Sequence, residues 1–228
     1  MKKDSMTEKI ITAIERAAGK MGIEEYERNL DKVTVYIDEL RKWNKAYNLV
    51  GRKIGEEGLV DLYIDSLTPL SVRGLFEGRK EVLDIGSGAG LPGIPLYLMV
   101  GPFPLTLVES QRKKITFLRH VCRVLNLEDV RVYPGRLEEM AREEDYLNAY
   151  EIGLARAVME PLRLSRAIRP LLCEGGKTVV FVGKKDAERI RKSGLDLEEK
   201  GMKLEALRSM QRIVGKENYL AVLRKTGR

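Results

Sequence analysis

The sequence contains very few of the side chains that most often bind metal ions or form disulfides. Its 228 residues include one histidine, His120, and two cysteines, Cys122 and Cys173, which lack CxxC spacing. A single histidine argues against zinc sites and against Ser–His or Cys–His catalysis. Two cysteines in apolar surroundings are typical of free thiols in a reducing compartment. We therefore expect no metal and a cytoplasmic location.

The sequence also predicts no signal peptide and contains no unbroken hydrophobic span. Five of the first nine residues are charged, and no apolar core region follows them. Residues 91–108 are 18 consecutive residues without charge, close to the length that spans a membrane. Prolines and glycines interrupt this stretch, and no helix can continue through Gly101-Pro102-Phe103-Pro104. We predict a buried helix, a turn and a buried strand there, and no membrane contact.

Positive charge is concentrated in the second part of the chain. The net charge is +7. Residues 1–78 carry 13 basic and 14 acidic side chains, whereas the rest of the chain carries 28 and 20. Such an excess attracts polyanions such as RNA, although scattered lysines can equally serve solubility alone. Charge by itself leaves these two interpretations open.

The pattern of apolar residues changes near residue 80. Before it, apolar residues recur at helical spacing and predict helices over 10–18, 26–40 and 56–70, with no strand. After it, short apolar runs alternate with helical segments, which is typical of a parallel, doubly wound sheet. We therefore predict an N-terminal helical appendage, residues 1–78, and an α/β domain, residues 79–228.

The α/β domain has five predicted strands followed by a hairpin. The five strands cover residues 81–85, 105–109, 130–133, 150–155 and 177–182. Helices are predicted near 112–125 and 136–142, and a third begins at Pro161 and ends at Gly175-Gly176. Residues 204–214 and 219–224 read as two strands joined by a turn, with no helix between them. The expected fold is a mostly parallel seven-stranded sheet with a C-terminal antiparallel hairpin.

A glycine-rich loop follows the first predicted strand, in the run Asp84-Ile85-Gly86-Ser87-Gly88-Ala89-Gly90. Glycines allow a tight turn, and the next helix directs free N–H groups at a ligand. Residues 88–93 match the dinucleotide pattern G-x-G-x-x-G, and Glu109 could bind ribose hydroxyls. The same layout holds S-adenosylmethionine. The residues alone leave open a nicotinamide-dependent oxidoreductase, a methyl-donor enzyme and a non-catalytic RNA-binding protein.

The glycine loop and its continuation, residues 84–96, resemble the signature of the RsmG family, also called glucose-inhibited division protein B. Further matches follow in order at 43–49, 64–67, 109–119 and 155–157. The resemblance implies a Rossmann-like class I methyltransferase that uses S-adenosylmethionine. It also implies the substrate, which is N7 of guanine 527, in the standard numbering of 16S ribosomal RNA. The expected partner is this RNA or the small ribosomal subunit, and we expect a monomer.

The predicted cofactor residues combine the loop pattern with the resemblance. The resemblance implies loop contacts, two residues that flank the adenine after the third strand, and an arginine beside the cofactor. Together with the loop acid and the ribose acid, the predicted site is Asp84, Gly86, Gly88, Leu91, Glu109, Leu137, Glu138 and Arg156. Leu62 stands where the family commonly has a histidine, and Gly183-Lys184-Lys185 replaces a lysine–glycine pair. We assign no catalytic residue.

Two basic segments predict an RNA surface. Residues 41–53 contain five basic side chains and no acid, with Trp43 and Tyr47 among them, and residues 112–123 contain five more. Basic and aromatic side chains together suit phosphate contact and base stacking. Trp43 has an alternative role, which is to pack the appendage onto the main domain. The predicted RNA contacts are Lys42, Lys45, Arg52, Arg119 and Lys184.

Overall fold

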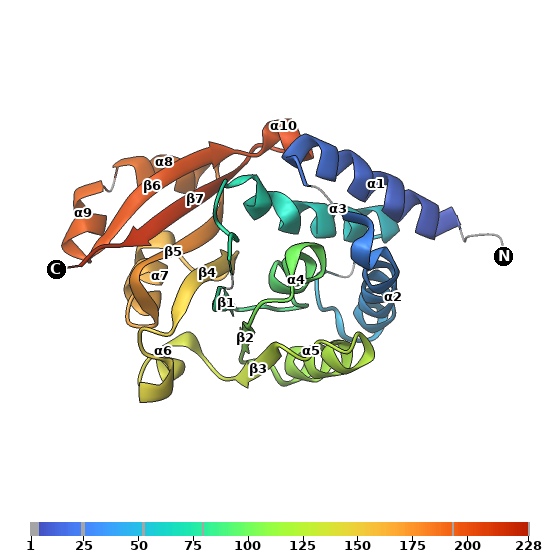
Figure 1. Ribbon diagram of the computed structural model, residues 1–228, viewed down its shortest axis with the longest axis horizontal. Helices are drawn as coiled ribbons and strands as arrows, with labels where there is room; N and C mark the ends of the chain where they lie inside the picture. The colour runs from blue at the N-terminus through green and yellow to red at the C-terminus, as the bar shows by residue number, and fades with distance from the viewer. Residues whose placement is uncertain (1–4, 24–25, 52, 79, 193, 228) are drawn as a thin grey trace.

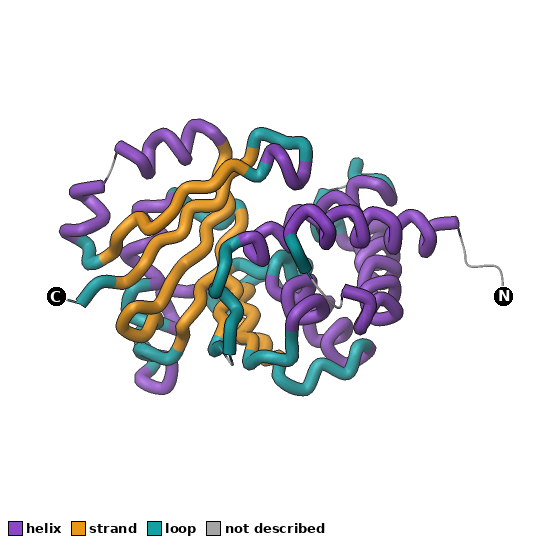
Figure 2. The backbone as a smooth tube through the Cα atoms, turned by 45° about the horizontal axis from the view of Figure 1, so that its top comes forward, coloured by secondary structure: helices purple, strands orange, loops and turns teal. Residues whose placement is uncertain are grey.

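Seven strands form one sheet in the order β3-β2-β1-β4-β5-β7-β6 (Figures 1 and 2). The computed structural model describes residues 5–227, apart from 24–25, 52, 79 and 193. β1 to β5 are parallel, and β7 is antiparallel to both of its neighbours, as the sequence predicts. The strands are β1 (Val82–Ile85), β2 (Leu105–Glu109), β3 (Val130–Pro134), β4 (Tyr150–Arg156), β5 (Leu172–Gly183), β6 (Met202–Ser209) and β7 (Asn218–Lys225).

Helices cover both faces of the sheet and bury two hydrophobic clusters. One cluster joins the first five α-helices and α10 to the sheet, and the other joins the remaining face to α6, α7, α8 and α9. In Figure 2 the N-terminal helices gather at one end of the sheet. The α-helices are α1 (Ser5–Met21), α2 (Leu30–Tyr47), α3 (Glu56–Leu67), α4 (Gly93–Val100), α5 (Arg112–Val124), α6 (Leu137–Met140), α7 (Pro161–Ile168), α8 (Lys184–Lys192), α9 (Gly194–Glu199) and α10 (Gln211–Val214).

The uncharged stretch 91–108 folds as the sequence predicts. It forms α4, a turn and β2, and almost all of its apolar residues are buried. α4 is apolar on all sides because α2 and α3 cover the surface that the sheet leaves exposed. In the part of the chain that the structure describes, no helix is long and apolar enough to cross a membrane.

The N-terminal helices share one hydrophobic core with the sheet. Ile10 and Ile14 of α1 belong to the same cluster as Leu107 of β2. The Trp43 ring lies tilted against that of Phe117 of α5, with 5.6 Å between the ring centres, so it packs the two parts of the chain together. This contact confirms the packing alternative for Trp43. The division of the chain at residue 78 stays a prediction.

Two boundary predictions near the C-terminus are wrong. Gly175-Gly176 does not end a helix, because α7 stops at Ile168 and β5 already begins at Leu172. Gly175 has a φ of 74° within a register shift of β5 against β4. The strand predicted over 204–214 ends at Ser209, and residues 211–214 form α10 instead. Here the hairpin closes through a hydrogen bond from the Met210 N–H to the Asn218 carbonyl, 2.8 Å long.

Candidate functional site

The glycine loop between β1 and α4 needs its glycines for their backbone conformation. Gly86, Gly88 and Gly90 have φ values of 62°, 60° and 87°, which residues with a Cβ rarely adopt. A Cβ on Gly86 would also lie 2.9 Å from Cγ2 of Val158. The loop therefore presents backbone atoms, not side chains, at the carboxyl end of β1.

Asp84 supports the loop from beneath. Its side chain is fully buried, and its Oδ2 accepts a 2.9 Å hydrogen bond from the first N–H of α4, that of Gly93. Its Oδ1 has no hydrogen-bond partner among the described residues. Burial raises the pKa of Asp84 to about 7, against the opposing effect of the Gly93 N–H. Asp84 thus fixes the start of α4, and burial makes its carboxyl easier to protonate than an exposed aspartate.

Glu109 at the end of β2 binds the loop directly. Its Oε2 accepts the Gly88 N–H at 3.0 Å, and its Oε1 accepts those of Ser110 and Gln111 at 2.9 and 2.8 Å. A carboxylate has about four acceptor positions, so these donors leave about one for a ligand hydroxyl. The carboxylate is therefore preoriented by the chain and still able to bind a ribose.

Two adjoining cavities open at the carboxyl ends of the strands. The larger of these two has a volume of about 400 Å³ and lies where the loop and Glu109 meet, and we call it the larger cavity. Four of the predicted cofactor residues line it, namely Gly86, Glu109, Leu137 and Glu138. The side chain of Glu138 lies 3.5 Å from Arg163, which sequence reasoning missed although it also lines the cavity. Buried Leu137 provides an apolar wall. A hydroxyl acceptor, the half-buried backbone of Gly86 and an apolar wall suit the ribose and adenine of an adenosine cofactor.

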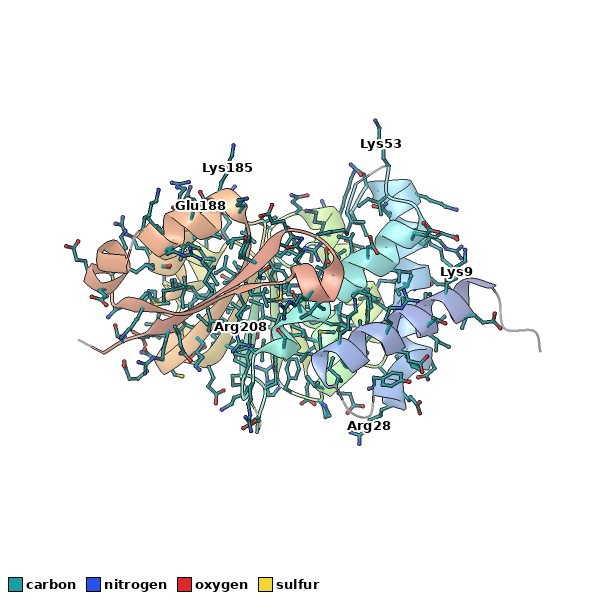
Figure 3. All side chains as sticks on the ribbon, turned by 90° about the horizontal axis from the view of Figure 1, so that it is seen from above. Lys9, Arg28, Lys53, Lys185, Glu188 and Arg208 are labelled. Carbon is teal, nitrogen blue, oxygen red and sulfur yellow. The ribbon has the colours of Figure 1, made fainter. Side chains whose placement is uncertain are left out.

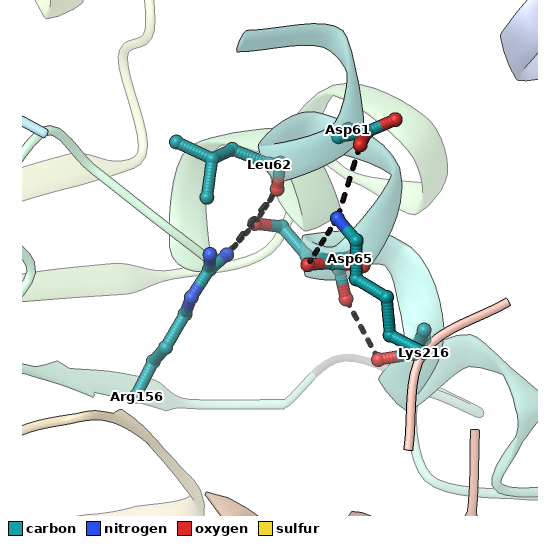
Figure 4. Close-up of polar contacts among 7 residues, drawn as sticks. Asp61, Leu62, Asp65, Arg156 and Lys216 are labelled. Carbon is teal, nitrogen blue, oxygen red and sulfur yellow. Dashed lines mark hydrogen bonds and ion pairs between the residues drawn. The ribbon is translucent and has the colours of Figure 1, made fainter. Parts of the chain in front are cut away.

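The other four predicted cofactor residues do not line the larger cavity. Asp84, Gly88 and Leu91 lie in or under the loop and shape it. Arg156 points to α3, where it donates hydrogen bonds to the Leu62 carbonyl at 3.2 Å and to Ser66 Oγ at 3.1 Å (Figure 4). Its guanidinium also lies 5.9 Å from the ring centre of Phe181. A direct contact of Arg156 with the cofactor stays a prediction.

A second cavity, of about 140 Å³, adjoins the first, and we call it the smaller cavity. Both cavities are lined by Ala157, which follows β4 with a φ of 51°. The smaller cavity combines residues from α3, β4, β5 and the C-terminal hairpin, among them Asp65, Arg156, Phe181, Met210, Asn218 and Tyr219. Sequence reasoning assigned no role to Asp65, although residues 64–67 are one of the matches to the family and were a usable signal.

The carboxylate of Asp65 is mostly buried and lies near two basic side chains. Its side chain is 14% exposed, and its Oδ2 lies 4.0 Å from Lys216 Nζ, which binds Asp61 more closely at 3.0 Å (Figure 4). Burial raises the pKa of Asp65, while the charges of Lys216 and Arg156 oppose that rise. Burial lowers the pKa of Arg156, and Asp65 is the first charge that counteracts this.

The structure brings some of the predicted RNA contacts together. Lys42, Lys45 and Arg119 are exposed on α2 and α5, which pack side by side. Lys42 forms a 2.7 Å ion pair with Glu39. Exposed Lys184 begins α8 near the smaller cavity and pairs with Glu217 at 3.0 Å. Arg52 lies outside the described residues.

His120 lies away from both cavities. Its Nε2 is 2.7 Å from Glu39 Oε2, and its ring lies tilted against that of Trp43, with 5.1 Å between the ring centres. The histidine thus belongs to the contact between α2 and α5. Among the described residues, no three histidine, cysteine or acidic side chains gather as a metal ion would require.

The fold of the chain is the Rossmann-like fold of S-adenosylmethionine-dependent methyltransferases, with the larger cavity at the carboxyl ends of its strands. A crystal structure of an S-adenosylmethionine-dependent methyltransferase from Aquifex aeolicus is similar, with a TM-score of 0.58, 20% identity, and coverage of 73% of this chain and 92% of that one. MtNAS in complex with S-adenosylmethionine also has a TM-score of 0.58, with 17% identity and coverage of 89% and 73%. At these identities the likeness concerns the fold.

Sequence comparison identifies the family. The pattern of GidB, described as rRNA small subunit methyltransferase G, matches residues 29–217. Proteins named ribosomal RNA small subunit methyltransferase G are similar in Caldanaerobacter subterraneus, at 32% identity over 85% of this chain and 80% of the relative, and in Thermotoga neapolitana, at 32% over 91% and 87%. The chain belongs to the rRNA small subunit methyltransferase G family, whose members are S-adenosylmethionine-dependent enzymes. This result excludes the nicotinamide-dependent alternative.

Proposed function

We propose that the chain transfers a methyl group from S-adenosylmethionine to N7 of one guanine in the 16S ribosomal RNA of the small subunit. The observation that supports this best is the Glu109 carboxylate, which three backbone N–H groups orient at the edge of the larger cavity. The names of the relatives support a small-subunit rRNA substrate. The choice of guanine N7 follows from the family resemblance.

The chemistry of N7 methylation fits the residues at the two cavities. S-adenosylmethionine, when bound, supplies an electrophilic methyl group on a positively charged sulfur. Guanine N7 has an in-plane lone pair and no proton at neutral pH, so the reaction needs no general base. The position of His120 beside Glu39, outside both cavities, is compatible with that. The residues of the chain have to orient the base and exclude water, which is catalysis by proximity.

A basic surface supports RNA as the substrate. Lys45, Tyr47 and Lys113 line a hollow of about 530 Å³ between α2, α3 and α5, and Lys113 lies 5.9 Å from the Tyr47 ring. Tyr47 is 46% exposed, so its ring is accessible for stacking on a base. Lys53 and Lys185 both project towards the top of Figure 3, so they lie on one side of the molecule. The predicted contacts Lys42, Lys45, Arg52, Arg119 and Lys184 remain part of this proposal.

The test is methyl transfer from labelled S-adenosylmethionine to 16S RNA and to small subunits that lack the modification. We expect label in a single N7-methylguanosine, at the position that the resemblance implies. Comparison of the two substrates shows whether RNA alone or the assembled particle is recognised. Label on another atom or nucleotide, or none with either substrate, would contradict the proposal.

We propose further that the protein acts as a monomer in the cytoplasm, where its ribosomal substrate is found. The exposed large apolar residues of the described chain are Val35, Tyr47, Val100, Val124 and Leu147, which are spread over several elements. Single exposed apolar residues of this kind do not form an association surface. Sedimentation of the purified protein checks this, and a stable dimer would contradict it.

A further inference from the structure

The smaller cavity lies where an acceptor base would have to meet the methyl donor. It shares the Ala157 wall with the larger cavity, and both open at the carboxyl ends of the central parallel strands. Ligands of open α/β sheets bind at these strand ends. A volume of about 140 Å³ is small for a whole nucleotide and suits a single planar base.

The walls of the smaller cavity match a flat aromatic ligand with polar edges. Phe181, Met210 and Tyr219 supply aromatic and apolar surface, and the Arg156 guanidinium lies over Phe181. Bases taken out of a stack are held between such side chains and are read along their Watson–Crick edge. The polar side chains available for that reading include the Asp65 carboxylate and the Asn218 amide.

The Asp65 carboxylate favours guanine over adenine. A carboxylate only accepts hydrogen bonds when ionised, and its two oxygens can accept two parallel N–H donors. Guanine presents N1–H and the N2 amino group side by side, whereas adenine presents an acceptor at N1. N7 lies on the opposite edge of the guanine ring, so a base held at Asp65 keeps N7 unbound and open to methyl transfer.

The position of Asp65 is fixed by the contacts of α3. Arg156 joins α3 to the end of β4 through the Leu62 carbonyl and Ser66 Oγ. The contact at position 62 uses the backbone, so it does not depend on the histidine that the family commonly has there. Thr68 Oγ1 also donates a 2.7 Å hydrogen bond to the Asp65 carbonyl. Arg156 is thus a positioning residue for Asp65.

We propose that the smaller cavity receives the target guanine and that the Asp65 carboxylate accepts its N1–H and N2 amino hydrogens. This inference rests on the proposed function, because it assumes that a guanine is the acceptor. It adds a binding site for the base and a residue that sets base specificity.

The test compares Asp65→Asn with Asp61→Asn on two RNA substrates. The matched control Asp61 lies one helical turn before Asp65, contacts the same Lys216, and does not line the smaller cavity. The substrates carry either guanosine or inosine, which lacks the N2 amino group, at the target position. The measurements are kcat/KM for methyl transfer, the affinity for S-adenosylmethionine, and the melting temperature.

We expect wild type and Asp61→Asn to prefer guanosine over inosine by about tenfold to a hundredfold, the effect of one charge-assisted hydrogen bond. Asp65→Asn should lose about tenfold or more on guanosine and most of its preference over inosine. Its cofactor affinity and melting temperature should stay near those of the wild type. If Asp65→Asn retains the full preference for guanosine, the assignment is wrong. If the wild type methylates no guanine N7, the proposed function itself fails, and this inference fails with it.

Discussion

Tyr36 of α2 is expected to stabilise the glycine loop by one buried hydrogen bond. Its hydroxyl donates to the Ala89 carbonyl at 2.8 Å, and its side chain is fully buried. Tyr36→Phe removes the donor and keeps the ring. A buried carbonyl that loses its partner costs about 1–3 kcal/mol. For a chain of this length this corresponds to a fall in melting temperature of roughly 2–10 °C.

Tyr63 of α3 offers a matched control. Its ring lies 6.1 Å from that of Tyr36 and is equally buried, but its hydroxyl has no hydrogen-bond partner among the described residues. Tyr63→Phe therefore removes an unsatisfied polar group, and we expect unchanged or increased stability. The two substitutions delete the same atom at neighbouring buried positions, so packing effects should be similar.

Urea denaturation of both variants and titration with S-adenosylmethionine check this prediction. Tyr36→Phe should lower the free energy of unfolding and weaken cofactor binding, because the Ala89 carbonyl belongs to the loop. Tyr63→Phe should do neither. Equal losses in the two variants, or no loss in Tyr36→Phe, would refute the reasoning that the hydroxyl of Tyr36 supports the loop.

Three further predictions concern the larger cavity and its support. Glu109→Gln places an amide where the carboxylate accepts backbone donors, and we expect a loss of about 1–3 kcal/mol in the free energy of unfolding together with weaker cofactor binding in calorimetric titration. Gly86→Ala strains a positive φ and meets Val158, and should cost about 1–2 kcal/mol and weaken cofactor binding. Gly19→Ala in α1, where a Cβ has open space, should instead stabilise by about 1 kcal/mol. Burial raises the pKa of Asp84 from about 3.8 in the unfolded chain to about 7, so the folded protein keeps a proton that the unfolded chain has lost in this range. The contribution of Asp84 to the free energy of unfolding therefore falls as the pH rises from about 4 to about 7. The part of this loss that lies between pH 6 and pH 8 is about 1 kcal/mol, and Asp84→Asn should abolish it in urea titrations.

Opposite outcomes would contradict each of these three. Unchanged cofactor affinity in Glu109→Gln would show that its backbone contacts do not shape the cavity. Equal stability of Gly86→Ala and Gly19→Ala would argue against strain in the loop. An undiminished loss of stability between pH 6 and pH 8 in Asp84→Asn would assign the pH dependence to another group.

The parts of the site that the sequence predicts are formed by neighbours in the chain. The run from β1 through the glycine loop to α4 is local, so composition and spacing were enough to predict it. The position of Glu109 beside the loop was predictable because β2 is the next strand after β1, and neighbouring parallel strands end at the same edge of the sheet. The wrong boundaries predicted at 175–176 and 204–214 arose because the local sequence there fits two different structures. Glycine pairs serve bulges as well as helix ends, and a short apolar run fits a helical turn as well as a strand.

The parts that the sequence did not predict depend on contacts between distant residues. The Tyr36 hydroxyl and the Ala89 carbonyl are 53 positions apart, and nothing local marks either as a partner. The family resemblance implies that Arg156 lies beside the cofactor, whereas the direction of its side chain depends on how α3 packs against the sheet. Asp65 and Asn218 meet in the smaller cavity only because the hairpin returns to the N-terminal helices.

That meeting of α3 with the C-terminal hairpin has a consequence for protein synthesis. The hairpin supplies Asn218 and Tyr219 to the smaller cavity, whereas the loop and the acid of the larger cavity are complete by Glu109. A growing chain on the ribosome can therefore form its cofactor loop long before the walls of its acceptor site exist. Methylation activity should begin only when translation has passed β7, because Asn218 and Tyr219 of the smaller cavity are made last.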